Sequence, residues 1–588
     1  MFSVERIAIR FSGLPTRTGP LTRGQANLLR VLLSGTPVCL DAVVPVPAGT
    51  TVADVAEALR ALLSRHESLR TTYRVGEPPT QVVEESGELV LKVVDVAPPT
   101  TPHLVEQVRR IHWDNPFTDP ASELPLRVAA LRLDGLITHV FLAISHVAAD
   151  LAAVVIVGAD LEKLLVGEEL APAGAQPLDF LAVENGVAMQ NRLRTSLRYW
   201  EDQLSTTTHS LFPQRWPEED GRLHPALLLR SQAAADALDR ASRRIGVSRS
   251  AVALTAVVVL IAHYTGQPVC PVTMPTDNRF LPRTRDYVGQ LGSDCFMPVD
   301  LRQLETFDAA ARTVRRESIR SYWYGWFDSG DVWPLYETVA TERGVHAHAR
   351  ELVVNDMSAI GPPAGRGSDA SLPQRYGLVG APVLDPDGAT TAAEGAWGRL
   401  APGAGRCWLE AEPSVSRLSV DLHRLEHELT VAFRADPRCF TGAEVVALAN
   451  AFEALVVAAG EATLALRDVR SATGLAPRAR DDDMYLVDSG WIRLRSARRL
   501  LAEVAGSASL VTAVPDARIG HRLVGYVGEG DWSPQSLHRA CVAALANRPG
   551  AMTPHTYVIC RGAPADRDDL DAWRRQPARD VGTGRPDR

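Results

Sequence analysis

The sequence predicts an α/β fold in which α+β layers with mixed sheets are divided among several domains. Two observations support this prediction. Strand-like and helix-like hydrophobic patterns alternate along the whole chain, which is typical of layered folds. The chain also has 588 residues, 46% of them hydrophobic, which is more than one hydrophobic core usually organises. We therefore expect two to four domains.

The first predicted half comprises residues 1–205 and opens with an alternating, strand-like segment. Residues 81–96 are expected to form a hairpin across Ser86-Gly87, and residues 124–145 a second hairpin across Asp134-Gly135. Apolar residues at helical spacing predict helices over residues 51–64, which follow a threonine cap, in the apolar run after residue 150, and over residues 187–204.

The second predicted half comprises residues 206–470 and has similar ingredients. Residues 360–405 are rich in Gly, Pro, Ala and Ser, which indicates a mobile loop or insertion. Helices are expected in "AADALDRASRRIG", over residues 249–264 and in "GAEVVALANAFEALVVAAG". Strands are expected in "CPVTMP", over residues 349–357 and within residues 418–436.

A third unit follows a predicted linker at residues 471–484. Residues 485–577 carry a compact β-α-β-β-α-β pattern that begins with one strand, "MYLVDSGWIRLRS", and predicts a small α+β subdomain. The tail, residues 578–588, is expected to be disordered.

Composition excludes several classes of protein. With 62 basic and 70 acidic residues, the formal charge is −8, which argues against a nucleic-acid binder. Seven cysteines without CxxC spacing predict neither a metal site nor disulfides. The N-terminus lacks the pattern of a signal peptide, and the longest apolar runs are too short to span a bilayer. We therefore expect a cytoplasmic protein.

The stretch "ISHVAADLAAVV" places His146 and Asp150 where a strand gives way to a helix. On position alone, His146 could be an ordinary core histidine and Asp150 an incidental helix cap. The alternative is functional: His146 faces a cleft, while Asp150 turns inward and buries its charge. A buried carboxylate needs a partner, because desolvating an ion costs several kcal/mol. Such a pair would hold the histidine loop rigid for acid/base chemistry.

Residues 145–151, "SHVAADL", resemble the His-His-x-x-x-Asp-Gly signature of the condensation domains of nonribosomal peptide synthetases. Further segments resemble that family in the same order along the chain, over roughly residues 1–470. They are "LTRGQANLL", "RHESLRTTY", "PLDFLAVEN", "LRYWEDQL", "AHYTGQPVCPVTMPTDNR", "YVGQLGSDCFMPVDL" and "LVVNDM".

The resemblance implies two chloramphenicol-acetyltransferase-like halves arranged in a V, with the active-site loop between them. His146 would be the catalytic residue, and Asp150 a structural residue paired with Arg279. The implied reaction is acyl transfer from a thioester on a phosphopantetheine arm to an amine or hydroxyl. No cofactor would be bound. No carrier motif is found in the sequence, so the acyl- or peptidyl-carrier protein would act in trans. Gly289, Ser293 and Asp294 would line the substrate tunnel.

Two departures bear on activity. Ser145 replaces the first histidine of the signature, and Leu151 replaces its glycine. Glycine can adopt positive φ and lets the backbone approach closely, whereas leucine fills that space. Three functions therefore stay open. They are a stand-alone condensation-type acyltransferase, a catalytically inactive scaffold that recruits carrier proteins or tailoring enzymes, and a related acyltransferase that uses free small-molecule acceptors.

The C-terminal region resembles the small subdomain of adenylation domains, through "GHRLVGYV" and "LANRPGAMTPHTYVI". That family carries a lysine near its end, but the matching stretch, "APADRDDLDAW", contains only Arg567 as a cation, a poor substitute for a lysine point charge. We predict that this unit does not adenylate. The aromatic cluster "YWYGWF", residues 322–327, could line a tunnel or dock a partner, or could simply pack.

Overall fold

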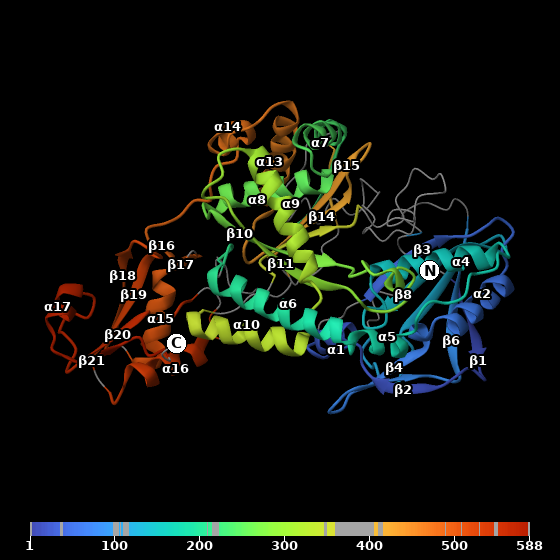
Figure 1. Ribbon diagram of the computed structural model, residues 1–588, viewed down its shortest axis with the longest axis horizontal. Coiled ribbons are helices and arrows are strands. Elements are labelled where there is room, and N and C mark those ends of the chain that lie inside the picture. The colour runs from blue at the N-terminus through green and yellow to red at the C-terminus, as the bar shows by residue number, and fades with distance from the viewer. Residues whose placement is uncertain are drawn as a thin grey trace.

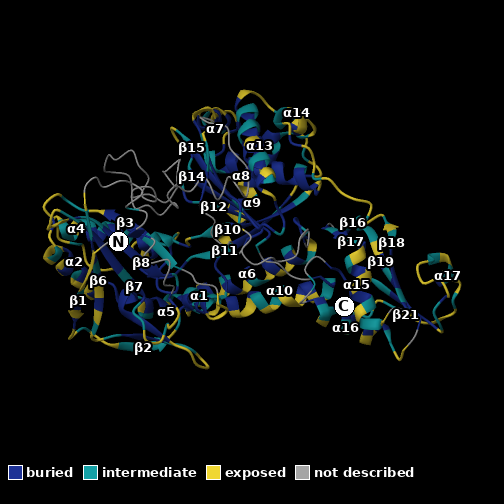
Figure 2. Ribbon diagram, turned by 180° about the vertical axis from the view of Figure 1, so that it is seen from behind, coloured by how far each residue is buried: buried dark blue, intermediate teal, exposed yellow. Residues whose placement is uncertain are grey.

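The computed structural model describes residues 3–35, 39–97, 105, 108–109, 117–207, 210–213, 223–345, 350–358, 405–409, 416–488, 490–506, 508–528, 530–545, 548 and 551–585. Three large sheets, each with its own apolar core, define an N-lobe, a C-lobe and a C-terminal unit (Figure 1). Figure 2 shows that the buried residues concentrate on the sheets and on the helix faces turned toward them.

The N-lobe sheet has the strand order β1-β6-β7-β8-β3, with β6 and β7 parallel and the other neighbours antiparallel. Helices α2 and α4 contact each other and pack with this sheet into one core. The elements are β1 Ser3–Phe11, α1 Arg23–Leu33, β3 Cys39–Pro45, α2 Val52–Arg65, β6 Gly87–Val96, β7 Leu126–Leu133, β8 Leu136–Ser145 and α4 Leu151–Leu165. A separate sheet has the order β2-β5-β4, with β2 Arg17–Pro20, β4 Thr71–Arg74 and β5 Thr80–Val83.

Local sequence explains two of these features. The Thr51 hydroxyl accepts the Asp54 N–H, and the Asp54 carboxylate accepts the Thr51 N–H at 2.8 Å, which forms a capping box at the start of α2. Between β7 and β8, Asp134 and Gly135 have φ values of 50° and 83°. This is the left-handed pair that a tight hairpin turn requires, as predicted.

The hairpin predicted over residues 81–96 is wrong. Both strands exist, but β5 pairs with β2 and β4, whereas β6 pairs with β1 and β7 in the N-lobe sheet. Ser86-Gly87 therefore lies at a crossover between two sheets. A local turn pattern does not reveal this, because each strand finds its partner far away in sequence.

The C-lobe sheet has the order β11-β10-β12-β14-β15-β9-β13, and its helices α7, α8 and α13 contact one another. Gly246 ends α7 in the left-handed conformation with φ 76°, as the predicted glycine stop requires. The elements are β9 Ala226–Ser231, α7 Gln232–Ile245, α8 Arg249–Thr265, β10 Val269–Thr276, β11 Ser293–Asp300, α9 Phe307–Trp323, β12 Leu352–Asp356, β13 Arg406–Trp408, β14 Leu418–Arg424, β15 Leu429–Ala435 and α13 Gly442–Glu461.

Among the described residues, α13 is long and apolar enough to cross a membrane, and so is the sharply bent pair of α7 and α8 if it is counted as one span. Half of the α13 window is buried within the protein, and its residues belong to the C-lobe core. Residues 360–404 of the predicted loop lie outside the described residues.

Helices α6 Val187–Thr206 and α10 Ser329–Arg343 lie below the C-lobe and run between the C-terminal unit and the N-lobe, where α5 Pro177–Glu184 lies (Figure 1). Helix α10 contacts both α6 and α1. At its C-terminal end, Ala340 and Val345 join the apolar core of the C-terminal unit. The Arg343 guanidinium pairs with Asp488 at 2.7 Å and donates to the Leu204 carbonyl at 2.9 Å. The C-terminal unit is thereby fastened to α10 and α6.

The C-terminal unit has the sheet order β17-β16-β19-β20-β21, with β18 also paired to β19. The predicted α+β order is confirmed, but its first strand is a hairpin that turns at Asp488, where φ is 48°. The elements are β16 Met484–Val487, β17 Gly490–Arg493, α15 Leu494–Ala505, β18 Ser509–Asp516, β19 Gly520–Val527, α16 Pro534–Leu545, β20 Thr556–Cys560, α17 Leu570–Arg575 and β21 Ala578–Gly582.

The prediction of a disordered tail is wrong for residues 578–585. Strand β21 pairs antiparallel with β20 and extends the sheet. The Arg585 guanidinium then donates to the Arg343 carbonyl at 3.2 Å. Polar composition suggested disorder, but the unpaired edge of β20 supplies the backbone hydrogen bonds that order this segment.

Candidate active site

A cavity of about 2140 Å³ lies between the two lobes. His146, Asp150 and Leu151 line it from the N-lobe, and Ser293 and Asp294 line it from the C-lobe. The two groups are far apart in sequence, and they meet because the loop after β8 faces the start of β11. The cavity therefore brings most of the predicted site together.

His146 lies in a tight turn between β8 and α4. The Ala148 N–H donates to the Ser145 carbonyl at 2.9 Å, which closes the turn. The Nδ1 atom of His146 lies 2.9 Å from the Ala149 carbonyl oxygen. A carbonyl oxygen only accepts, so Nδ1 carries the hydrogen and the neutral ring keeps its free lone pair on Nε2. Burial lowers the pKa of His146 below its usual value, opposed by the Asp150 charge and the Ala149 carbonyl. These surroundings favour the neutral form of the imidazole.

Asp150 is the N-cap of α4, and its carboxylate is fully occupied. Oδ1 accepts the Ala153 N–H at 2.9 Å, and the Arg279 guanidinium donates to Oδ1 at 2.7 Å and to Oδ2 at 2.9 Å. Oδ2 also accepts the N–H groups of Leu291 and Gly292 at 3.0 and 3.1 Å. Both charged side chains are at most 7% exposed. The buried carboxylate therefore has the cationic partner that the sequence requires, and it ties the histidine loop to the C-lobe.

The backbone of Leu151 does not adopt a conformation that requires glycine. It is the first residue of α4, in right-handed helical backbone, and it is not among the four non-glycine residues of the described chain with positive φ. Its side chain is half-buried and forms part of the cavity wall beside His146 without closing the cavity. Ser145 is buried as the last residue of β8, and its N–H donates to the Pro125 carbonyl at 2.9 Å.

The three tunnel candidates separate in the structure. Ser293 and Asp294 line the cavity. The Ser293 hydroxyl accepts from the Asn278 amide at 2.8 Å and donates to the Gly325 carbonyl. Gly289 is buried and is not among the residues that line this cavity, so its role as a tunnel residue stays a prediction. A Cβ at this position would overlap the Tyr287 ring, and the Gly289 carbonyl accepts the Asp150 N–H at 3.4 Å.

Reasoning from sequence missed Arg350, which lines the cavity and pairs with Asp294. The two residues meet because Asp294 lies in β11 and Arg350 precedes β12, with β10 between these strands in the sheet. The backbone N–H groups of Leu291 and Gly292 were also missed. The side-chain pattern of a sequence does not reveal which backbone N–H groups donate to a site.

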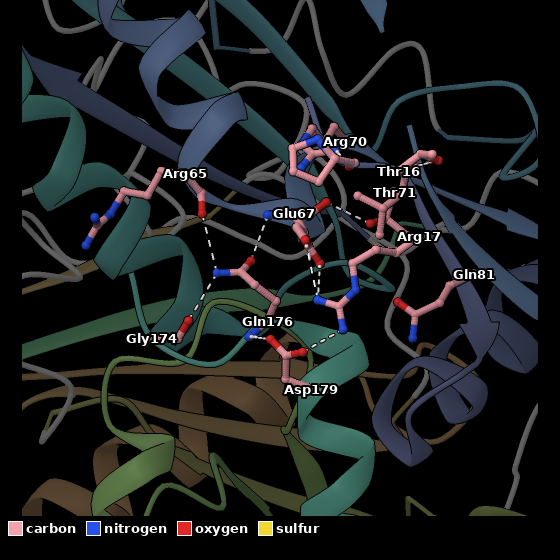
Figure 3. Close-up of polar contacts among 12 residues, drawn as sticks. Thr16, Arg17, Arg65, Glu67, Arg70, Thr71, Gln81, Gly174, Gln176 and Asp179 are labelled. Carbon is pink, nitrogen blue, oxygen red and sulfur yellow. Dashed lines mark hydrogen bonds and ion pairs between the residues drawn. The ribbon is translucent and has the colours of Figure 1, made fainter. Parts of the chain in front are cut away.

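The segment "RHESLRTTY" contributes Arg65 and His66 to the cavity wall and holds the neighbouring chain through polar contacts. Figure 3 shows Gln176 between Arg65, Glu67 and Gly174: its amide nitrogen donates to the Arg65 and Gly174 carbonyls, and its amide oxygen accepts the Glu67 N–H at 2.9 Å. Arg17 bridges Glu67 at 3.2 Å and Asp179 at 2.5 Å. These contacts hold Gly174 and Gln176, which follow the cavity-lining residues Ala171 and Pro172 in the chain.

The aromatic cluster 322–327 has no single role, and its residues lie in different environments. Tyr322 lines the cavity. Trp326 and Phe327 are buried and pack in the helix layer, with Trp326 stacked on Phe180 and Phe327 edge-on to Trp200. Trp323 is 58% exposed. The cluster therefore contributes to the cavity wall, to the core and to the surface.

A family model and several known proteins are similar to this chain in sequence. The family model described as the condensation domain matches residues 35–333, half of the chain. Bacitracin synthase 2 of Bacillus licheniformis is 22% identical over 52% of this chain and 12% of its own length. Tyrocidine synthase 3 of Brevibacillus parabrevis is 24% identical over 45% of this chain and 4% of its own length. The chain thus spans a small part of these curated relatives.

Solved structures share the fold. SgcC5 of Streptomyces globisporus superposes with a TM-score of 0.57 at 18% identity, over 75% of this chain and 99% of its own. The X-domain from teicoplanin biosynthesis gives 0.57 at 16%, over 76% and 96%. The first condensation domain of the calcium-dependent antibiotic synthetase gives 0.55 at 17%, over 76% and 98%. The chain belongs to the condensation-domain family, and the two-lobed, chloramphenicol-acetyltransferase-like fold is confirmed.

Proposed function

We propose that this chain is a condensation-type acyltransferase. It would join an acyl group, carried as a thioester on the phosphopantetheine arm of a carrier protein, to an amine or hydroxyl acceptor. One observation carries the proposal: His146 lies on the wall of a large interlobe cavity with Nδ1 bound to the Ala149 carbonyl, which leaves Nε2 as the free base. The relatives named above are peptide synthetases, which supports carrier proteins as partners.

In the proposed reaction, the acceptor nitrogen or oxygen attacks the thioester carbonyl and forms a new C–N or C–O bond. Nε2 of His146 takes the proton of the acceptor. The C–S bond then breaks, and the departing thiolate takes that proton back from the imidazolium. General-base help is typically worth about 10²–10⁴-fold in rate. Holding both substrates in one cavity can add more, because effective molarities reach about 10⁵ M or higher.

The environment of His146 suits this role. The ring must be neutral to accept a proton, and burial lowers its pKa. Asp150 cannot take the proton instead, because its carboxylate already accepts from Arg279 and three backbone N–H groups. We propose that it positions the histidine turn. The reaction so derived uses no bound cofactor and would take place in the cytoplasm, which the unpaired state of all seven cysteines supports.

Intact-mass spectrometry of acyl-loaded carrier domains tests the proposal. The wild type is expected to move the acyl group from the carrier to an amine or alcohol acceptor, and His146→Ala is expected to slow transfer by about 10²–10⁴-fold. His139→Ala is the matched control, because His139 lies in the same strand, β8, but does not line the cavity. Transfer that survives His146→Ala unchanged would contradict the general-base role.

The alternative is a catalytically inactive scaffold that recruits carrier proteins or tailoring enzymes. The substitutions at Ser145 and Leu151 favour it, since both depart from the family signature. Carrier binding with no transfer by the wild type, across a panel of acyl groups and acceptors, would support the scaffold over the enzyme.

A further inference from the structure

The C-lobe wall of the cavity holds an ion pair whose two charges are only partly used. Oδ2 of Asp294, at the start of β11, pairs with Nη1 of Arg350, which precedes β12. Nε of Arg350 also donates to the Ser416 hydroxyl at 3.4 Å. Among the described residues, Oδ1 of Asp294 accepts no hydrogen bond and Nη2 of Arg350 donates none. The pair therefore offers one unused negative and one unused positive hydrogen-bonding site, side by side.

Both side chains of this pair are open to the cavity. They line it, and Asp294 and Arg350 keep 16% and 29% of their side-chain surface exposed. Asp294 also acts on the proposed base: burial lowers the pKa of His146, and the Asp294 charge is among the groups that oppose this shift. The unused charges thus lie within electrostatic reach of the imidazole that would receive the proton in the proposed reaction.

A third polar group on this side of the cavity is also unused. Gln290 lines the cavity and is 1% exposed. Its Nε2 donates to the Gly292 carbonyl at 3.2 Å, whereas its buried Oε1 has no partner among the described residues. A Cβ on Gly292, which lines the cavity two residues before Asp294, would lie 3.5 Å from this oxygen. A buried carbonyl oxygen without a donor costs free energy, and a ligand with N–H groups would supply the donor.

We propose that the acyl acceptor is a free α-amino acid, bound as a zwitterion with its ammonium on Asp294 and Gln290 and its carboxylate on Arg350. The inference rests on the proposed acyl transfer and names its acceptor. The ammonium and the carboxylate of an α-amino acid are attached to one carbon, so they lie side by side as the two charges of the pair do. The planar guanidinium fork suits a carboxylate, and an ammonium has three N–H donors for the two oxygen groups.

Other acceptors fit this wall less well. An amino acid held as a thioester or an amide has lost its carboxylate charge, so it leaves the unused donor of Arg350 without an anion. An alcohol has a single O–H donor and no positive charge for Asp294. Discrimination is strongest where a mismatched ligand leaves polar groups of the site unpaired.

The transfer to an amino acid balances as follows. The bound ammonium first releases one proton to water and becomes a neutral amine. The amine nitrogen forms a C–N bond with the thioester carbonyl carbon, and the C–S bond breaks. The second proton passes through Nε2 of His146 to the departing thiolate. The products are an N-acyl amino acid with a free carboxylate and the thiol form of the donor.

Calorimetric titration of the full chain with small acyl acceptors tests the proposal without any acyl donor. A thermal-shift screen of the standard amino acids, each beside its primary amide, first selects the side chain that binds best. Four probes then share this side chain: the free acid, its amide, the amine without a carboxylate, and the acid with a hydroxyl in place of the ammonium. Only the free acid offers both charges.

The variants are Asp294→Asn, Arg350→Gln and the two together. The double variant leaves no unpaired charge, so it serves if a single variant does not fold. Asp300→Asn with Arg302→Gln is the matched control, because this exposed pair includes the last residue of the same strand, β11, and does not line the cavity.

We expect the wild type and the control to bind the free acid at least tenfold more tightly than the other three probes, and the double variant to lose this preference. Equal binding of the acid and its amide by the wild type, or a preference that the double variant keeps, would overturn the proposal. Mass spectrometry with an acyl-loaded carrier then separates the two proposals. Selective binding of the acid without transfer would retain the zwitterion site and reject the acyltransferase. Transfer to the amide as fast as to the acid would retain the acyltransferase and reject the site.

Discussion

At the residue scale, the site depends on the fully hydrogen-bonded carboxylate of Asp150 and on the orientation of the His146 imidazole. Asp150 accepts five hydrogen bonds, four of them from the segment that contains Arg279, Leu291 and Gly292. His146 is oriented by the carbonyl of the residue before Asp150. Because the two groups share one short turn, any change at Asp150 reaches the histidine through the backbone.

Replacing Asp150 with Asn should strongly destabilise the lobes, because Arg279 would keep a buried and uncompensated charge. Removing one partner of a buried ion pair typically costs about 3–5 kcal/mol. Urea denaturation followed by circular dichroism measures the change in unfolding free energy. Asp300→Asn is the control, since the pair of Asp300 and Arg302 is largely exposed and such pairs contribute about 1 kcal/mol or less. A loss below about 1 kcal/mol for Asp150→Asn would contradict this account.

The pKa of His146 should lie below the usual value of about 6.5, because burial disfavours the imidazolium. In the proposed reaction the neutral form is the base, so the site should stay active down to a lower pH than an exposed histidine would allow. NMR titration of the imidazole Cε1–H signal, assigned by its loss in His146→Gln, measures this pKa without any substrate. Asp294→Asn should lower it further, since the Asp294 charge raises the pKa of His146. A titration midpoint at or above 6.5 would refute this prediction.

At the element scale, α4 fixes the site through its first turn. Asp150 caps the helix and Leu151 begins it, so the family's glycine is replaced at a position where the backbone is already right-handed. The strand-to-helix junction is therefore regular structure, and Leu151 changes the cavity wall rather than the path of the chain.

Leu151→Gly should lower the free energy of unfolding by about 1 kcal/mol, because glycine is a poor helix former and leaves the cavity wall without an apolar side chain. Thermal unfolding compared with Ala152→Gly, one residue further along the same turn, separates the helix-propensity effect from the lost side chain. A more stable Leu151→Gly protein would mean that this position needs the backbone freedom of glycine.

Sequence patterns predicted elements better than pairings. The capped helix at residues 52–65, the turn at Asp134-Gly135 and the glycine stop at Gly246 depend on local chemistry, and all are present. Strand β5 was predicted to pair with the wrong strand, and β21 was predicted as a disordered tail, because their pairing depends on the folded sheets. At the site, the need of Asp150 for a cation could be predicted, because a carboxylate in an apolar run requires one. Arg350 and the N–H groups of Leu291 and Gly292 could not be predicted, since only the tertiary fold brings them there.

At the scale of the whole molecule, the C-terminal unit is an integral part of the protein. Its core includes Ala340 and Val345 from the end of α10, and the Gly344 carbonyl accepts the Thr553 N–H at 2.8 Å. Helix α10 extends from this contact to the cavity, where Trp333 forms part of the wall and donates to Asn27 of α1 at 3.1 Å. The resemblance of this unit to an adenylation subdomain stays a prediction.

Gly344→Ala should loosen the C-terminal unit from α10. Gly344 has φ +71° and a Cβ there would overlap the Thr553 hydroxyl, whereas Gly246 has φ +76° and open space around it. Gly246→Ala is therefore the control, because it adds the strain of a left-handed backbone without a steric overlap. That strain destabilises the fold by about 1–2 kcal/mol. Limited trypsin digestion should cut the Gly344→Ala protein faster at Arg478 and Arg480, whose side chains are held against the C-lobe. Equal cleavage of both variants would argue against docking through this glycine.

The Asp150 contacts also set a rule for recombining related proteins. The carboxylate belongs to the N-lobe, but four of its five donors come from residues 279–292 of the next half. A chimera joined between residues 206 and 278 would draw the two sides of this contact from different parents. A crossover placed after residue 292 takes the Asp150 carboxylate and its donors from the same parent. Hybrids made there should therefore keep an intact turn at His146, whichever parent supplies the rest of the C-lobe.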